Sequence, residues 1–157
     1  MSIIKLNNKG VKNATAVGSI TGLGNLVFIS RSTASSSSSV SITSGIDSTY
    51  KEYIFFFNNM HPSANSYFSF NMSIDGGSNY NVTKTSNHFY SLHYENDATT
   101  QVDFDAGRTL AQGTGIQHLS AYCGTGSDEG VSGYLHLFDP SNTTFSKHFM
   151  ARTSGIT

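Results

Sequence analysis

The sequence contains no tryptophan, one cysteine and two prolines among its 157 residues. The single cysteine, Cys123, excludes an intrachain disulfide. The missing tryptophan removes the largest aromatic surface for stacking on sugars, which argues against a carbohydrate-binding protein although several tyrosines are present. Because proline cannot donate a ladder hydrogen bond, two prolines leave most of the chain free to pair as strands.

Charge is also scarce, since 9 Lys and Arg side chains oppose 10 Asp and Glu side chains for a net charge of −1. A nucleic-acid-binding surface would be basic, so we expect no nucleic-acid partner. The longest apolar run, Tyr53–Phe57, is far shorter than the ~20 residues that cross a bilayer. Met1–Gly10 has no apolar signal core. We therefore expect synthesis in a cytoplasm and no membrane insertion.

Small polar residues and aromatic rings dominate instead. Ser, Thr, Asn and Gly account for 69 residues, and 19 residues are Tyr or Phe. Residues 68–74 alternate between apolar and polar side chains, which is typical of a strand with one buried face. The turn-forming segment Asp75–Ser78 and a second alternating segment, Tyr80–Lys84, follow. This pattern predicts a β-hairpin.

No window of a dozen residues keeps a helical apolar period, so we predict an all-β fold. The other candidate strands are Ile3–Leu6, Thr15–Ile20, Asn25–Arg31, Val40–Thr43, Tyr50–Asn58, His88–Glu95, Gly115–Cys123, Val131–Phe138 and Thr143–Ala151. Many short strands with turn residues between them indicate a sandwich or a closed barrel. We favour an antiparallel β-sandwich of jelly-roll type, formed by residues 1–157 as one domain. Alternatively, residues 1–20 form an extended N-terminal arm of that domain.

The most apolar segment contains Tyr53, Ile54, Phe55, Phe56 and Phe57 on consecutive positions. A strand directs consecutive side chains to opposite faces, so both faces of this one need cover. Only one face can meet the core, and an uncovered second face would be prone to aggregate. We therefore predict that these five residues contribute to a subunit interface, although a loop or another sheet could also cover them.

Patterns that carry catalysis are missing. The sequence lacks the Gly-x-Ser-x-Gly motif of a nucleophile elbow. His118 and Cys123 fall on opposite faces of one predicted strand, so we interpret Cys123 as a core residue rather than a nucleophile. The loop Gly124–Gly130 lacks the Lys-Ser/Thr ending of a phosphate-binding loop. We predict no enzyme, no catalytic residue and no cofactor.

Six histidines raise the question of a metal site, but none forms a His-x-His or His-Glu-x-x-His pattern. Asp139–Asn142 is typical of a type I turn that would join the last two strands. A hairpin symmetric about this turn would place His136 and His148 on opposite faces, where they cannot share a metal. We therefore predict no metal-binding histidines.

Glu95, Asp97, Asp103 and Asp105 form one acidic segment. Oxygen ligands at such spacing could hold calcium, but the segment does not match the Asp-x-Asp-x-Asp-Gly pattern. We treat it as a candidate calcium-binding or ligand-binding loop, with a solvated acidic turn as the alternative. The serine run Ser35–Ser39 is typical of a flexible loop or of a solvated edge strand.

Five segments, in order along most of the chain, resemble a family of virion structural proteins encoded by marine tailed phages, including cyanophages. They are Ser2–Lys12, Thr33–Ser38, Tyr50–Pro62, Gly77–Thr83 and Gly133–Ser141. The resemblance implies a structural component of the virion, made in the host cytoplasm and displayed on the particle exterior, and it carries over no binding residues. Members of that family continue with further strands after the segment that resembles Lys147–Met150, whereas this sequence stops seven residues later. We therefore expect neighbouring subunits to complete the sheet.

Small size and a polar, weakly charged surface favour a capsid decoration or cement protein. Such a protein would contact the phage major capsid protein or other virion proteins through many weak contacts, and we expect a homotrimer. The alternative is a tail or fibre-associated adhesion module that binds a receptor through the loops Asp97–Asp105 and Gly124–Gly130.

Overall fold

A computed structural model describes residues 26–156, which form an all-β structure with antiparallel strand pairing. The strands are β1 (Glu52–Met60), β2 (Ser66–Phe70), β3 (Lys84–Ser86), β4 (Phe89–His93), β5 (Thr100–Phe104), β6 (Leu110–Gly113), β7 (Gln117–Cys123), β8 (Gly130–Phe138) and β9 (His148–Ile156). Within this range, the 3₁₀ turn Ala106–Arg108 is the sole helical element. The predicted all-β class is confirmed.

Residue contacts divide the chain into two units, residues 1–31 and residues 32–157. Residues 26–31 of the first unit form no strand, so the predicted strand Asn25–Arg31 is wrong for these residues. An apolar run becomes a strand only where another strand pairs with it. The predicted strands Ile3–Leu6 and Thr15–Ile20 and the alternative arm 1–20 lie outside the described residues. The single domain of residues 1–157 stays a prediction.

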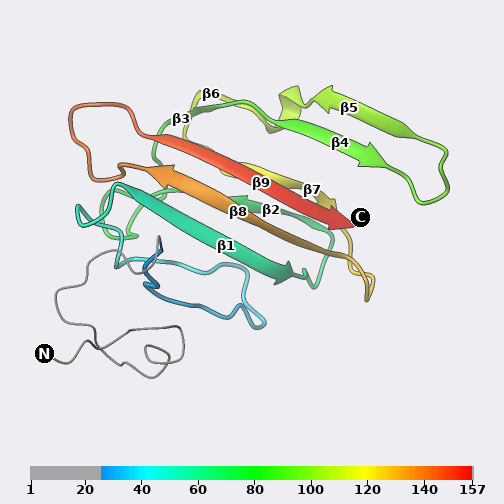
Figure 1. Cartoon of the computed structure of the whole chain (residues 1–157), viewed down its shortest axis with the longest axis horizontal. Helices are drawn as coiled ribbons and strands as arrows, with labels where there is room; N and C mark the ends of the chain where they lie inside the picture. Colours follow the sequence, from blue (N-terminus) through cyan, green and yellow to red (C-terminus); the bar gives the residue numbers. More distant parts are fainter. Residues whose placement is uncertain (1–25, 157) are drawn as a thin grey trace, which may run out of the picture. The chain divides into compact units, whose positions relative to one another are not determined.

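In the second unit, the strands form one three-stranded sheet and three two-stranded sheets (Figure 1). The larger sheet has the order β1–β8–β9, so the central strand β8 joins strands from opposite ends of the unit. The pairs are β2 with β7, β3 with β6, and β4 with β5. Figure 1 shows β2 and β7 behind the three-stranded sheet.

The hydrophobic core lies between these two layers. Leu135 and Leu137 of β8 pack with Leu119 of β7, and all three are buried. The partly buried side chains that complete the cluster are Phe55, Phe57, Phe68, Phe70, Met72, Phe149 and Ala151. Each large apolar side chain contributes about 1.5–3 kcal/mol when fully buried, so this cluster holds the two layers together.

A buried polar network lies beside the core. Lys84 at the start of β3 is 4% exposed, and its ammonium donates hydrogen bonds to Asn71 Oδ1 at 2.5 Å and to the Val82 carbonyl at 2.8 Å. Gln117 of β7 is also buried, and its amide donates to the carbonyls of Arg108 and His118. Burial lowers the pKa of Lys84, because desolvation disfavours the charged form.

The predicted hairpin of residues 68–84 is wrong. The turn Asp75–Ser78 forms, with positive φ angles at Gly76 and Gly77. Its flanking segments do not make a ladder, although the Val82 N–H donates a long hydrogen bond of 3.4 Å to the Met72 carbonyl. β2 pairs with β7 instead. Alternation indicates which face of a strand is buried, but it does not select the partner strand.

The last hairpin forms with a different register from the predicted one. The turn at Asp139–Asn142 is present, but residues 139–147 all belong to the connection, and Phe138 pairs with His148. His136 therefore pairs with Met150, and His136 and His148 lie on the same face of the sheet. The prediction of opposite faces is wrong, because the loop is longer than a symmetric hairpin allows.

Sequence patterns were less reliable for short segments. The segment Val40–Thr43 forms no strand, and Ser35–Ser39 is an exposed loop rather than an edge strand. The strand β5 and the short strand β6 were not expected from the sequence. β5 alternates over only the four residues Gln101–Phe104 and β6 does not alternate, so the pairing of β5 with β4 and of β6 with β3 is needed to specify them.

Candidate functional site

Strand β1 has apolar side chains on both faces, as its sequence indicates. Tyr53 is buried and its hydroxyl donates to the Asp47 carbonyl, while Phe55 and Phe57 join the core. Phe56 is on the opposite face and is 69% exposed. The structure therefore separates the five predicted interface residues into three that stabilise the fold and two, Ile54 and Phe56, that are free for another role.

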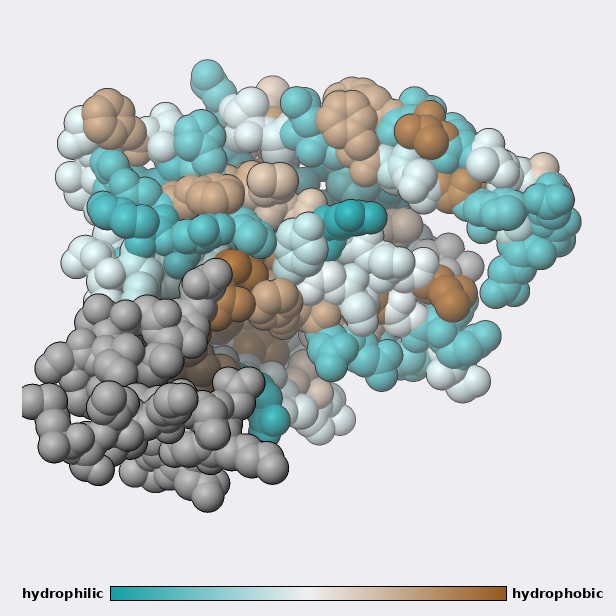
Figure 2. Space-filling model, viewed as in Figure 1, coloured by the Kyte–Doolittle hydropathy of each residue, from teal (hydrophilic) through white to brown (hydrophobic). Residues whose placement is uncertain are grey.

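The side chains beside Ile54 and Phe56 extend this apolar surface across the sheet. Ile54 pairs with His136, which pairs with Met150, and Phe56 pairs with Tyr134. We name the following residues the outer face: Ile54, Phe56, Tyr134, His136, Phe138 and Met150. In Figure 2 apolar side chains gather over β1, on the side of the sheet turned away from β2 and β7.

Polar groups border the outer face. His136 Nδ1 lies 2.5 Å from Glu52 Oε1, and it forms an ion pair when the ring is protonated. The rings of Tyr134 and Phe138 flank His136 with centroid distances of 5.2 and 6.0 Å. Arg152 is exposed beside Tyr134. An apolar centre with a polar border is the usual composition of a protein–protein contact.

The backbone of β1 offers a second kind of contact. β1 is an edge strand of its sheet, and among residues 26–156 no strand other than β8 pairs with it. The opposite edge strand, β9, is linked to β7 because the Thr153 hydroxyl donates to the Leu119 carbonyl at 2.6 Å. An unpaired edge can accept a strand from another chain. The β1 edge therefore adds directional hydrogen-bonding groups next to the outer face.

The structure does not bring the four predicted acidic residues together. Glu95 and Asp97 lie in the β4–β5 turn, Asp103 lies in β5, and Asp105 caps the 3₁₀ turn. The partners of the three aspartates are His93, Gln101 and Arg108, respectively. Residues 26–156 contain no group of three or more His, Cys, Asp or Glu side chains that could hold a metal ion. Nothing in this arrangement supports a calcium site.

The loop Gly124–Gly130 connects β7 and β8, as expected of a strand connection. The Glu129 carboxylate folds back into the loop and accepts a hydrogen bond from the Gly126 N–H. The adjacent Cys123 is 2% exposed, and burial together with the nearby Glu129 charge raises the pKa of its thiol. Cys123 is therefore a core residue, as predicted. The Glu129 carboxylate already occupies the loop, and its negative charge would repel a phosphate.

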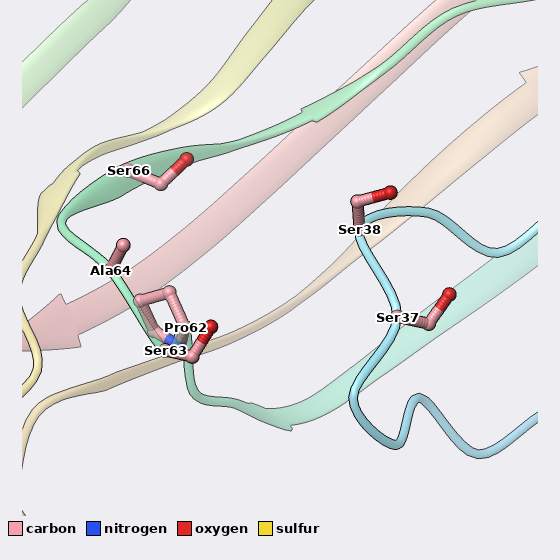
Figure 3. A pocket seen from close by; sticks show the side chains of 6 residues that line it. All are labelled: Ser37, Ser38, Pro62, Ser63, Ala64 and Ser66. Carbon is pink, nitrogen blue, oxygen red and sulfur yellow. The ribbon is translucent and has the colours of Figure 1, made fainter.

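A shallow hollow of about 260 Å³ lies between the serine run and the segment before β2. Figure 3 shows the residues that line it: Ser37, Ser38, Pro62, Ser63, Ala64 and Ser66. The lining has hydroxyl groups but no charged, aromatic or metal-ligating side chain. Ligand sites normally combine apolar walls with a few directed polar groups, so this hollow is a poor candidate.

Sequence analysis missed a second group of side chains, two exposed tyrosines with a half-buried serine and histidine, on the side of β2 and β7 that is turned away from the core. Tyr67, Ser69, His118 and Tyr122 meet there because Tyr67 pairs with Tyr122 and Ser69 pairs with His118. Arg108 of the 3₁₀ turn lies over the Tyr67 ring. The only signal in the sequence is the alternation of Tyr67 and Ser69 with core phenylalanines, which could not identify the partner strand.

Comparison with known proteins finds no matching protein-family model, curated protein or solved structure. Across residues 26–156, no helix has the length and hydrophobicity that crossing a membrane requires. The outer face and the β1 edge are therefore the structural features from which function is inferred.

Proposed function

We propose that this protein is a structural component of a tailed-phage virion, without enzymatic activity, that decorates or cements the capsid from the particle exterior. The observation that carries the proposal is the outer face, where Phe56 and Met150 are 69% and 61% exposed on a regular sheet. Large apolar side chains aligned on a sheet face mark an interaction surface. The proposed partners are other copies of this chain and the major capsid protein or other virion proteins.

The binding would come from burial and repetition rather than from chemistry. Covering one large apolar side chain contributes about 1.5–3 kcal/mol, so Ile54, Phe56 and Met150 together could support one modest contact. Ordering and desolvation offset part of that gain. Repeating the contact in a trimer on a symmetric shell raises the effective concentration of each further contact. Many weak contacts would then hold the protein firmly on the particle.

We further propose that a neighbouring subunit completes the three-stranded sheet at the β1 edge, which would extend the fold toward the predicted jelly-roll sandwich. The unpaired edge of β1 and the apolar residues beside it support this placement. A strand added there would pair with the backbone groups of this edge and place its own side chains beside Phe56.

The self-association is tested with the variant Phe56→Asp, measured by sedimentation velocity over a range of concentrations. We expect the wild-type protein to form trimers and the variant to dissociate, because an aspartate at a buried contact would be desolvated. Phe145→Asp is the matched control, since Phe145 is 72% exposed but lies in the β8–β9 connection. A wild-type protein that stays monomeric, or a Phe56→Asp variant that stays trimeric, contradicts the proposed interface.

The place on the particle is tested by quantitative mass spectrometry of purified virions. A copy number comparable with that of the major capsid protein supports decoration of the head. A copy number that is a small fraction of it contradicts decoration and points to the tail or fibre-associated adhesion module.

A further inference from the structure

The side of the β2–β7 sheet turned away from the core carries an organised set of aromatic and polar groups. We name Tyr67, Ser69, Arg108, His118 and Tyr122 the tyrosine–histidine face. The Tyr67 ring lies 4.9 Å from the Tyr122 ring and 4.6 Å from the His118 ring, measured between centroids. The Arg108 guanidinium carbon lies 4.9 Å from the Tyr67 centroid. The side chains of Tyr122, His118 and Arg108 therefore all pack against the Tyr67 ring.

Both tyrosines remain accessible, since Tyr67 is 37% and Tyr122 is 46% exposed. An isolated surface tyrosine needs no explanation. Here the Tyr67 ring packs edge to face with the Tyr122 ring and also contacts His118 and Arg108, so the two tyrosines form a preorganised apolar platform. Preorganisation matters because little side-chain entropy is then lost when a ligand binds.

Polar groups border the platform in fixed positions. Ser69 Oγ lies 2.8 Å from His118 Nδ1, and Arg108 Nη1 lies 2.7 Å from Asp105 Oδ2. Burial and the nearby Arg108 charge lower the pKa of His118 below its usual value of 6.5, which keeps the ring neutral near pH 7. Because Ser69 Oγ and His118 Nδ1 are bonded to each other, the groups left for ligand hydroxyls are the second ring nitrogen of His118, Nε2, and a lone pair of Ser69 Oγ.

The charge balance selects among ligand classes. The Arg108 charge is paired with the Asp105 carboxylate, and both side chains are largely buried. A phosphate, sulfate or carboxylate ligand would therefore meet a fixed negative charge beside the one cation. A neutral ligand with many hydroxyl groups and apolar C–H faces avoids that repulsion, and sugars have this composition.

We propose that the tyrosine–histidine face binds a neutral saccharide, with the Tyr67 and Tyr122 rings packing on C–H faces of the sugar and with Ser69 and His118 bonding its hydroxyl groups. The paired tyrosines would supply the stacking surface that the missing tryptophan led us not to expect. The site would let the protein attach to neutral glycans at a surface. It does not depend on the proposed function, because it lies on the β2–β7 layer and uses none of the outer-face residues.

The probe is an array of immobilised oligosaccharides that includes neutral hexose and N-acetylhexosamine chains beside sulfated and uronic-acid chains. We expect the full-length protein to bind a subset of the neutral chains. Titration calorimetry with a soluble form of the best array ligand then compares Tyr122→Ala with the wild type. Loss of one aromatic contact should weaken binding about tenfold or more.

Tyr94→Ala is the matched control, because Tyr94 is 53% exposed but lies after β4, outside the tyrosine–histidine face. Ser69→Ala provides a second variant that removes one hydroxyl group without opening the core. Circular dichroism and sedimentation establish that each variant keeps its fold and assembly state. Absence of binding to every neutral chain, binding to acidic chains alone, or equal losses in Tyr122→Ala and Tyr94→Ala would overturn the proposal.

Discussion

Replacing Asn71 with alanine should destabilise the fold in large part through Lys84. The structure gives the Lys84 ammonium two acceptors, Asn71 Oδ1 and the Val82 carbonyl, and no ion pair with any carboxylate in residues 26–156. Lys84 is 4% exposed, so water cannot readily replace a lost acceptor. The Asn71→Ala variant would leave a buried cation with one carbonyl.

The magnitude follows from the bonds that are lost. A hydrogen bond to a charged group contributes about 1.5–3 kcal/mol, and a neutral one contributes about 1 kcal/mol. Asn71 also donates to the carbonyls of Tyr80 and Thr114 and accepts from the Met72 N–H. We expect a total loss of about 4.5–6 kcal/mol, of which about 1.5–3 kcal/mol depends on the Lys84 charge. Lys84→Met keeps the volume without the charge, so it should be neutral or stabilising.

The assay is a double-mutant cycle measured by urea unfolding, with tyrosine fluorescence and circular dichroism as probes because the chain lacks tryptophan. The wild type, Asn71→Ala, Lys84→Met and the double variant give the coupling free energy. Asn96→Ala is the control, since Asn96 accepts one exposed local hydrogen bond from Ala98. A coupling below about 0.5 kcal/mol would refute the reasoning, because independent sites add within that range.

Four further outcomes are expected. Because the folded-state pKa of Lys84 lies below its usual value of 10.5, the unfolded state binds more protons between the two values. The free energy of unfolding should therefore rise with pH across that window in the wild type and rise less in Lys84→Met, as measured by urea titrations. Hydrogen bonds from Ser73 and Asn79 hold the pKa of Asp75 at about 2. The stability that the Asp75 carboxylate contributes above pH 3.8 should therefore be lost as the pH falls toward 2. Acid unfolding of the Asp75→Asn variant should not show this loss. A Cβ atom on Gly133 would overlap the Arg152 carbonyl across the β8–β9 ladder, so Gly133→Ala should lower the free energy of unfolding by about 1–3 kcal/mol or more, and unchanged thermal unfolding would contradict the close approach. Cys123 should resist a thiol reagent in the native protein and react once urea unfolds it, whereas fast native labelling would contradict its burial.

Strands with strong local patterns could be predicted from the sequence, and their partners could not. The apolar run at Tyr53–Phe57 identified β1 and its two apolar faces, and Cys123 was correctly placed in the core. The ladder from β2 to β7 joins residues about fifty positions apart, so no local signal could show that Tyr67 meets Tyr122. The register of the last hairpin could not be predicted either, because it depends on the length of the loop. The connection has nine residues, 139–147, and it places His136 and His148 on one face of the sheet.

The long-range pairing of β1 with β8 has a consequence for synthesis. Glu52 and its contact His136 are 84 positions apart in the chain. At about 5–20 residues per second, a ribosome needs roughly 4–17 s to add the residues between them. During that interval β1, the most apolar strand, has no partner strand, and such high contact order slows folding further. Nascent chains should therefore depend on chaperones or on low expression temperature, and aggregation during synthesis, rather than instability of the finished fold, should limit the yield of recombinant protein.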